Sequence, residues 1–236
     1  MDIHGLKQIK GFISDAELTF LYNRAKNTKG VILEIGSWMG RSTMSLALGA
    51  QAGHRAKVYA IDCTLPTEFY ENIKKFGVED TVNPITEFEQ EANKKWNLPI
   101  SLFFSDVHYH DDKALANLFV SWGSHLIEGG VVALNNVSPS FLAIFEQSPV
   151  WGLPVPKKIG KKYILNSGQF KNCGLAGTIL YGTKCSRINF LDKILNSFVS
   201  WKIDFYSVLF KVYLIFRKIP FPLKGKIKSF LLRVFK

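Results

Sequence analysis

Residues 31–43 read VILEIGSWMGRST: an apolar run with an acid in it, two glycines four positions apart and a pair of small hydroxyl residues. An apolar run of this length, bounded by glycine, is typical of a buried strand, and the stretch from Ser42 to about Gln51 has helical character. A second short apolar run that ends in an acid, VYAID, follows at 58–62. The spacing therefore predicts a β-α-β unit, with Glu34 and Asp62 at the carboxyl ends of its two strands.

The alternation continues through the body of the chain. Strands are expected at 81–85, 100–104 and 131–137, and helices at 69–76, 88–96 and 113–126. Gly77 is expected to cap a helix, and Glu128–Gly130 to form the turn before the last of these strands. Such alternation predicts an α/β fold, in which a doubly wound, mostly parallel sheet is covered by helices on both faces. Ligands bind beyond the carboxyl ends of the strands in these sheets.

The charge of the chain is concentrated near its end. The 236 residues include 30 Lys and Arg and 19 Asp and Glu, a net charge of +11. Residues 187–236 hold 11 of the basic residues and two of the acids, which leaves 19 against 17 for residues 1–186. We therefore expect a nearly neutral domain at 1–186 and a basic tail at 187–236. No nucleic-acid partner is expected, because a binding groove would need a basic surface across the domain.

The cysteines and the first residues favour a cytoplasmic protein. The three cysteines, Cys63, Cys173 and Cys185, are far apart and have no C-x-x-C spacing for zinc or redox chemistry. We therefore expect reduced thiols. The first residues, MDIHGLKQIKGF, lack the apolar core of a signal peptide.

The turn GSWMGRS at 36–42 fails two familiar phosphate-binding patterns. A P-loop needs four residues between its glycines and then a lysine, whereas three residues separate Gly36 from Gly40 and Arg41 follows. A dinucleotide fingerprint needs glycine where Trp38 stands. A tight turn without any ligand remains an alternative for a motif of this kind.

The two acids favour a ligand without phosphate. Glu34 precedes the first glycine by two residues, where its charge would repel a phosphate and attract a cationic group. Asp62 ends the neighbouring strand, where a carboxylate can accept both hydroxyls of a ribose. Together they predict a pocket for a positively charged nucleoside that carries an amino acid.

Five segments extend this pattern, in order and spacing: LEIGSWMGRSTMSLA, VYAIDC, FYENIKKFGVEDTVNPI, ISLFFSD and IEGGVVALNNV. Over about residues 28–140 the chain resembles the class I S-adenosylmethionine-dependent methyltransferases, in particular the sugar and small-molecule O-methyltransferases of glycan and natural-product pathways. The resemblance implies a seven-stranded sheet whose last two strands are antiparallel, with AGTILYG (176–182) as a candidate for one of them. It also implies S-adenosylmethionine as cofactor, bound by Glu34, Gly36, Ser37, Gly40, Ser42 and Asp62.

The expected reaction centre departs from the family. In FFSDVHYHDD (103–112), Asp106 keeps the first family acid, while His108 stands where a second acid is usual. We assign Asp106, His108 and His110 as catalytic candidates, since removal of a hydroxyl proton needs a base that titrates near working pH. The alternative for HYHDD is a solvated loop in which Asp111 or Asp112 caps the next helix.

A metal ion offers a second way to acidify the acceptor hydroxyl. Asn135 and Asn136 replace the acidic end of the fifth strand, so a site made with Asp106 would have one anionic ligand. Hard cations prefer more. A divalent metal is therefore possible but not favoured, and none of these residues is assigned to a metal.

Residues 138–175 are a candidate segment for binding the acceptor. They contain four prolines and are expected to form a substrate-facing loop or lid. Within this segment, KKIGKK (157–162) is either a solvated charge run or a contact for an anionic substrate.

The tail at 187–236 is a candidate segment for contact with a membrane. It combines helical apolar spacing with basic residues and is interrupted too often by charge to span a bilayer. It is expected to lie on an anionic membrane surface, as a peripheral anchor, or else to pack on its own domain or a second copy.

Two functions follow. The first is an S-adenosylmethionine-dependent methyltransferase that modifies a hydroxyl of a sugar, glycolipid or related small molecule at the membrane surface. The alternative is a catalytically inactive adaptor or binding protein of the same fold, held at the membrane, because the usual acidic and histidine positions are altered. The acceptor and the oligomeric state are left open by the sequence.

Overall fold

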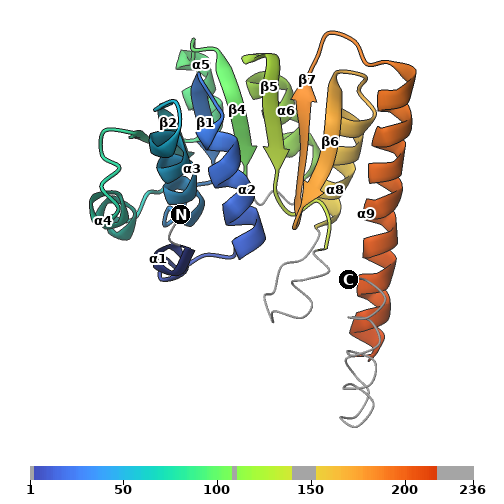
Figure 1. Ribbon diagram of the computed structural model, residues 1–236, viewed down its shortest axis with the longest axis horizontal. Coiled ribbons are helices and arrows are strands. Elements are labelled where there is room, and N and C mark those ends of the chain that lie inside the picture. The colour runs from blue at the N-terminus through green and yellow to red at the C-terminus, as the bar shows by residue number, and fades with distance from the viewer. Residues whose placement is uncertain (1–2, 108–110, 140–152, 217–236) are drawn as a thin grey trace.

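The structure is a computed structural model that describes residues 3–107, 111–139 and 153–216 (Figure 1). Its centre is a seven-stranded sheet in the order β3-β2-β1-β4-β5-β7-β6. The strands are β1 (Val31–Ile35), β2 (Val58–Asp62), β3 (Val82–Thr86), β4 (Ile100–Ser105), β5 (Leu126–Leu134), β6 (Phe170–Ala176) and β7 (Ile179–Lys184). The first five are parallel, whereas β7 runs antiparallel to both β5 and β6. The sheet is therefore mixed, and the expected antiparallel final pair is confirmed.

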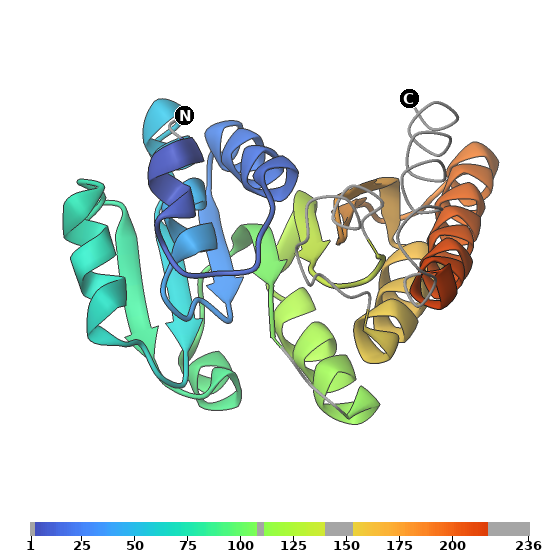
Figure 2. The ribbon, with the colours of Figure 1, turned by 90° about the horizontal axis from the view of Figure 1, so that it is seen from below.

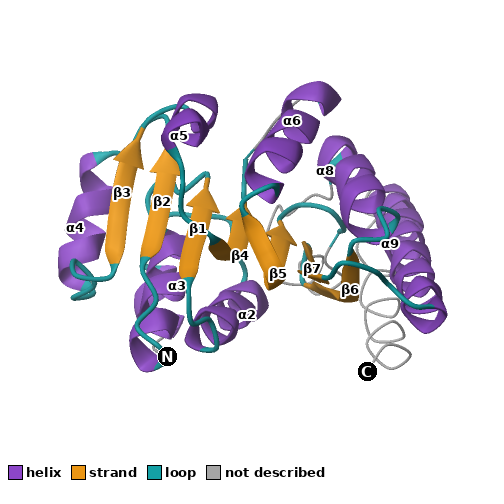
Figure 3. Cartoon of the chain, turned by 90° about the horizontal axis from the view of Figure 1, so that it is seen from above, coloured by secondary structure: helices purple, strands orange, loops and turns teal. Residues whose placement is uncertain are grey.

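Helices cover both faces of this sheet, as Figures 2 and 3 show from below and from above. The described helices are α1 (Ile3–Lys7), α2 (Asp15–Lys26), α3 (Arg41–Ala52), α4 (Thr67–Lys75), α5 (Glu89–Lys95), α6 (Asp112–Gly123), α8 (Pro154–Gly160), the π-helix η1 (Lys161–Leu165) and α9 (Phe190–Phe216). One buried apolar cluster joins the sheet to α1, α2, α3 and α4. A second joins it to α5, α6, α8, η1 and α9. The doubly wound α/β fold predicted from the sequence is thus confirmed.

The first β-α-β unit forms as predicted, because β1 and β2 occupy the two apolar runs and α3 lies between them. Gly77 has a left-handed backbone with φ +62°, which suits its expected role after α4. Asp111 caps α6: its carboxylate accepts the backbone N–H groups of Lys113 and Ala114 at 3.1 and 3.3 Å. Of the two cap residues considered, the structure selects Asp111.

Three predicted boundaries were wrong. The helix at 113–126 ends at Gly123, and Glu128–Gly130 lies within β5 as an irregularity of the β4–β5 pairing. Residues 176–182 do not form one strand, because Gly177, with φ +61°, turns the chain between β6 and β7.

The second half of the segment expected to form a loop at 138–175 instead contains helices and the start of a strand. Pro154 occupies the first turn of α8, where proline is tolerated because that N–H has no partner within the helix. Helix α8 then leads through η1 into β6. The first half of the expected loop, 140–152, lies outside the described residues.

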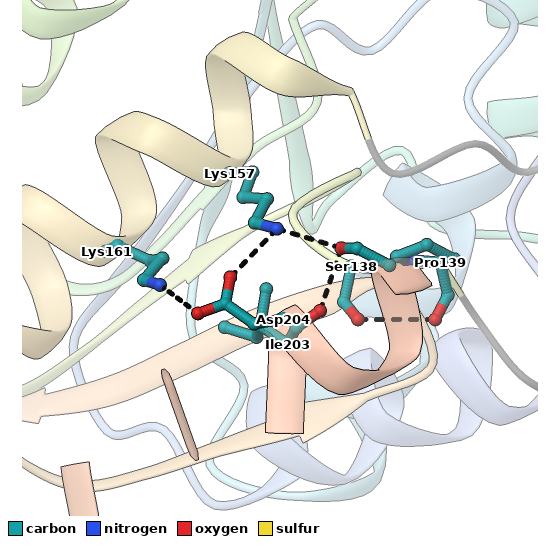
Figure 4. Close-up of polar contacts among 7 residues, drawn as sticks. Ser138, Pro139, Lys157, Lys161, Ile203 and Asp204 are labelled. Carbon is teal, nitrogen blue, oxygen red and sulfur yellow. Dashed lines mark hydrogen bonds and ion pairs between the residues drawn. The ribbon is translucent and has the colours of Figure 1, made fainter. Parts of the chain in front are cut away.

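Two lysines of KKIGKK hold α9 against the domain, as the close-up in Figure 4 shows. Lys157 and Lys161 approach the Asp204 carboxylate at 2.9 and 2.7 Å, and Lys157 also donates to the Ser207 hydroxyl at 3.0 Å. These two lysines are therefore engaged with α9 instead of being free for an anionic substrate. Figure 1 shows α9 running beside β6 along one edge of the sheet.

No helix within the described ranges is long and apolar enough to cross a membrane.

Candidate functional site

A cleft of about 410 Å³ opens at the carboxyl ends of β1, β2 and β4. This is the edge of the sheet where ligands bind in open α/β folds. The glycine turn 36–42 forms its floor, and the residues after β2 and β4, including Asp62 and Asp106, form two of its sides. The loop 10–13 and the segment 87–89 complete the lining. The structure thus brings most of the predicted site residues to one cavity.

The floor of the cleft depends on two glycines in left-handed conformations. Gly36 has φ +89°, and a Cβ built there would lie 2.7 Å from the carbonyl oxygen of Asp106. Gly40 has φ +86°, and its Cβ would meet the Phe69 ring at 2.9 Å. Since backbone and core atoms occupy these positions, a side chain at either glycine would displace the turn. Glycine at both positions therefore maintains the shape of the cleft floor.

Glu34 lies beneath this turn and does not line the cleft. It is fully buried, and its Oε2 atom accepts hydrogen bonds from the hydroxyls of Ser37, at 2.9 Å, and Thr43. Its Oε1 atom has no hydrogen-bond partner among the described residues. Burial raises the pKa of Glu34 to about 7 against the opposing effect of nearby hydroxyls, including that of Ser42. Glu34 therefore fixes the turn and brings a carboxyl group that a nearby cation would ionise.

Asp62 is oriented by two backbone groups. Its Oδ2 atom accepts the Trp38 N–H at 2.9 Å, and its Oδ1 atom accepts the Thr64 N–H at 3.1 Å. The carboxylate lines the cleft, and each oxygen retains acceptor capacity. Its charge is close enough to contribute to the raised pKa of Glu34. The two acids predicted to form one pocket are thus neighbours, one on its wall and the other under its floor.

Asp106 follows β4 on the opposite side of the turn. Its Oδ1 atom accepts hydrogen bonds from the side-chain amides of Asn135 and Asn136 at 2.7 and 3.3 Å. Removal from solvent raises the pKa of Asp106 to about 8, although the Asn135 hydrogen bond opposes this change. The charges of Glu34 and Glu17 raise it further. Asp106 is therefore a cleft carboxyl group that titrates close to neutral pH.

A chain of hydrogen-bonded, buried side chains connects Asp106 to Glu17 of α2. The Thr178 hydroxyl lies 2.6 Å from Asn135 Oδ1 and 2.6 Å from Glu17 Oε1. Glu17 is fully buried and also accepts the Thr178 N–H at 2.7 Å and the Ser14 N–H at 2.7 Å. The chain Glu17–Thr178–Asn135–Asp106 joins α2, the β6–β7 turn, and the ends of β5 and β4. It fixes the orientation of the Asn135 amide and hence of Asp106.

This orientation does not suit a metal ion. Asn135 presents its amide nitrogen to Asp106 and its oxygen to Thr178, so the oxygen that would bind a cation is engaged elsewhere. Within the described part of the chain, no group of three or more His, Cys, Asp and Glu side chains could hold a metal. The donor set beside Asp106 therefore fits a hydrogen-bond network better than a hard cation, which prefers several anionic oxygens.

The other two catalytic candidates, His108 and His110, lie outside the described residues. Ser37 and Ser42 line the cleft floor, and both are buried. Ser37 turns its hydroxyl down to Glu34. Ser37 therefore stabilises the shape of the turn.

The N-terminal segment supplies a wall that the sequence did not predict. Arg41, in the first turn of α3, donates to the backbone carbonyls of Lys7, Ile9 and Gly11 at 2.9, 2.7 and 2.9 Å. One guanidinium thus holds the loop before α2 against the glycine turn. The sequence signal that could have located α2 is the capping pattern S-x-x-E from Ser14 to Glu17, in which the acid is now also a buried network residue.

Two aromatic side chains stand at the mouth of the cleft. Phe12 stacks on Trp38 with ring centroids 6.0 Å apart and an interplanar angle of 4°. Both line the cleft and remain substantially exposed, as does Phe88 on the β3 side. Exposed aromatic faces beside a cavity can stack on a planar or ring-shaped ligand. Glu89, next to Phe88, has a pKa raised by burial.

Comparison with known proteins places this cleft in context. A family model described as "Methyltransferase domain" matches residues 33–137, which run from β1 to just beyond β5. A search of curated proteins gave no match.

Solved structures share the fold at low sequence identity. Cofactor-bound Rv0187 from MTB has a TM-score of 0.58 and 19% identity, over 77% of this chain and 87% of that one. The O-methyltransferase from Bacillus cereus in complex with SAH gives 0.56 and 17%, over 77% and 87%. The O-methyltransferase TomG from Streptomyces achromogenes, involved in tomaymycin synthesis and crystallised with SAM, gives 0.54 and 17%, over 74% and 82%. At these identities the likeness establishes the architecture of the chain.

Proposed function

The chain has the class I methyltransferase fold, and on that premise we propose that it binds S-adenosylmethionine and transfers the methyl group to an acceptor hydroxyl. The observation that carries the proposal is the placement of Glu34 and Asp62 at neighbouring strand ends, under and beside one cleft. Paired acids favour a cationic, phosphate-free nucleoside over a nucleotide. Several structural neighbours were crystallised with SAM or SAH, which supports the same ligand here.

The residues of the cleft have separable roles in this proposal. Asp62, already oriented by two backbone groups, accepts the ribose hydroxyls. The backbone of Gly36 and Gly40, which lines the cleft, lies against the ligand. Glu34 stabilises the positive charge from beneath the turn, because a nearby cation lowers the pKa of a carboxyl group. When bound, the cofactor supplies an electrophilic methyl group.

Asp106 is the proposed residue for handling the acceptor proton. A carboxyl group with a pKa of about 8 is partly ionised near neutral pH and can accept a proton from a hydroxyl that attacks the methyl group. Asn135 and Asn136 keep it in place by donating to one oxygen. His108 and His110 remain proposed as alternative or additional bases from their positions in the sequence.

We further propose that the acceptor is a sugar, glycolipid or related small molecule and that the enzyme meets it at an anionic membrane surface. The aromatic pair Phe12 and Trp38 at the cleft mouth supports a ring-shaped acceptor, because aromatic faces stack on sugar or other rings. The basic tail at 187–236 supports the membrane location.

Calorimetry with S-adenosylmethionine tests the cofactor site. Wild-type protein should bind, and Asp62→Ala should lose measurable binding. Asp80→Ala, at an exposed carboxylate that does not line the cleft, is the matched control and should bind like the wild type. Equal affinity of the Asp62 variant would reject the assignment of this carboxylate.

An adaptor without catalysis is the second candidate, favoured by Asn135 and Asn136 at the end of β5 in place of acids. Incubation with S-adenosylmethionine labelled in the methyl group, together with small-molecule and lipid extracts of the source cell, distinguishes the two. Transfer of label that is lost in Asp106→Asn supports the enzyme. Cofactor binding without any transfer supports the adaptor.

A further inference from the structure

Helix α9 carries apolar side chains on two faces. Its inward face packs on the second apolar cluster through Val199 and the fully buried Ile203. Asn196, also buried, donates from the same face to the carbonyl oxygens of Leu165 and Phe170 at 3.3 and 2.9 Å. The ion pairs of Asp204 with Lys157 and Lys161 hold the rotation of the helix (Figure 4). The inward face is therefore committed to the domain.

The outward face is exposed and apolar over more than five turns. Phe190 is 78% exposed, Phe198 60% and Trp201 57%. With these we define the outward face as Phe190, Leu191, Ile194, Leu195, Phe198, Trp201, Phe205, Val208 and Val212. At about 100° per residue these positions fall within an arc of about 140° on the helix. Such a continuous stripe on a helix already packed on its other side needs an occupant.

Aromatic stacking keeps the outward face in order. The Phe198 and Trp201 rings stack with centroids 5.7 Å apart, and the Trp201 and Phe205 rings with centroids 5.3 Å apart. The three rings therefore form one surface along the helix. Trp and Phe are favoured at the boundary between headgroups and acyl chains, where helices of this kind lie in the plane of a membrane.

Lysines border the outward face on both sides. By helical position, Lys193 and Lys211 lie about 60° beyond one edge of the arc, and Lys202 lies about 20° inside the other edge. Long basic side chains beside an apolar stripe can extend to lipid headgroups while their stems cover apolar surface. The two acids of the region are occupied elsewhere: Asp204 pairs with the domain lysines, and Asp192 accepts the Asn189 N–H at 3.2 Å.

The net charge of residues 187–236 distinguishes between a second copy of the chain and a lipid bilayer as the partner of the outward face. Residues 187–236 carry 11 basic residues and two acids, a net charge of +9. A second copy docked through the same face would bring two such regions together, and their like charges would repel. An anionic bilayer satisfies both the apolar stripe and the positive charge.

We propose that the outward face of α9 lies flat on an anionic lipid bilayer and is the docking surface of this protein. This inference rests on the membrane location in the proposed function and adds to it the surface that contacts the bilayer. The docking itself requires no methyl transfer. In Figure 1 the far end of α9 extends past the sheet on the side to which the arrowheads of β4 and β5 point. The helix therefore ends on the side of the sheet where the cleft opens.

Vesicle flotation with the full chain tests the proposal. Wild-type protein should float with phosphatidylcholine vesicles that contain 30% phosphatidylserine, and at least tenfold less with phosphatidylcholine alone. The variant Phe198→Ser/Trp201→Ser should lose at least tenfold in apparent affinity for the anionic vesicles. Val120→Ser, at a 62% exposed apolar position of α6, is the matched control and should bind like the wild type.

Two further measurements keep the outcomes distinct. Circular dichroism and calorimetry with S-adenosylmethionine should be unchanged in the Phe198→Ser/Trp201→Ser variant, so failed docking is not confused with a failed fold or cofactor site. Equal vesicle binding by this variant and the wild type would overturn the proposal. A dimer in light scattering that this variant abolishes, with no vesicle binding by the wild type, would assign the face to a second copy and also overturn it.

Discussion

Two carboxyl groups at the cleft, Glu34 and Asp106, have pKa values set mainly by burial. Glu34 and Asp106 both have raised pKa values, about 7 and about 8, because removal from solvent disfavours their ionised forms. Neither has a salt-bridge partner among the described residues. A cationic ligand would supply the missing charge. The two groups therefore make both ligand binding and folding sensitive to pH.

The contribution of Asp106 to the stability of the protein should fall as the pH rises between about 4 and 8. Asp106 in the unfolded chain loses its proton near 3.8, whereas in the folded chain it keeps it to about 8. The unfolded state binds fewer protons in this window, so the slope is negative, up to about 1.4 kcal/mol per pH unit for one group. Asp106→Asn removes that group, and its advantage over the wild type in urea unfolding should grow from pH 5 to pH 8.

The control for this prediction is Asp80→Asn, at an exposed aspartate, which should keep the slope of the wild type. Parallel pH dependences for Asp106→Asn and the wild type would show that Asp106 ionises normally in the folded chain.

The Thr178 hydroxyl is expected to position Asp106 at a distance. Thr178→Val keeps the shape but removes the hydroxyl between Glu17 and Asn135, and should lower the free energy of unfolding by about 1–3 kcal/mol. If methyl transfer is established, kcat should fall while the affinity for S-adenosylmethionine stays unchanged. Thr178→Ser retains the hydroxyl and should keep the kcat of the wild type. Indistinguishable Val and Ser variants would remove Thr178 from the network.

At the scale of elements, the glycine turn has no room for a side chain at Gly36 or Gly40. Gly36 combines a left-handed backbone with contact to the chain after β4, so two separate costs arise from any side chain there. The loop 10–13 and the turn are held to each other by Arg41, which links the N-terminal segment to α3. The cleft is therefore built from one tightly packed turn and a wall attached to it.

Gly36→Ala should separate these two costs when it is compared with Gly168→Ala. Gly168 has φ +77° and nothing within 4 Å of a built Cβ, so its substitution costs the backbone strain of about 1 kcal/mol. Gly36→Ala adds a clash with the Asp106 carbonyl and should cost about 2–4 kcal/mol in total. Thermal and urea unfolding measure both. Equal losses in the two variants would show that the turn yields to the methyl group.

Considered as a whole, the molecule is a methyltransferase-fold domain to which α9 is attached along one edge (Figure 1). The helix shares a core with the domain through its inward face and leaves its outward face exposed. The inward face packs on the domain, and the outward face is the proposed docking surface. A substitution on the outward face should therefore leave the packing of α9 on the domain intact.

Substitutions on the inward and outward faces of α9 should therefore differ in their effect on the free energy of unfolding. Ile203→Ser opens the core and buries a hydroxyl, and should lower the free energy of unfolding by about 2–4 kcal/mol. Phe198→Ser, at an exposed position, should change it by less than about 0.5 kcal/mol. Urea unfolding of the full chain compares them. A large loss for Phe198→Ser would mean that its ring is covered in solution.

The sequence by itself determined the first five strands in outline, the glycine turn and the acids Glu34, Asp62 and Asp106, because local periodicity and turn chemistry are written in consecutive residues. It did not determine the start of β5 or the β6–β7 hairpin, since pairing between distant strands sets the first and Gly177 turns within an apolar run that resembles one strand.

Only the tertiary structure decided which residues share an environment. It placed Glu34 under the turn instead of on the cleft wall. It also joined Glu17 to Thr178, 161 positions away in the chain, and through Asn135 to Asp106. It also showed that the apolar stripe expected in the tail is the exposed face of α9, while Val199 and Ile203 pack inward. Burial and hydrogen-bond partners arise from contacts between distant segments, which no local pattern contains.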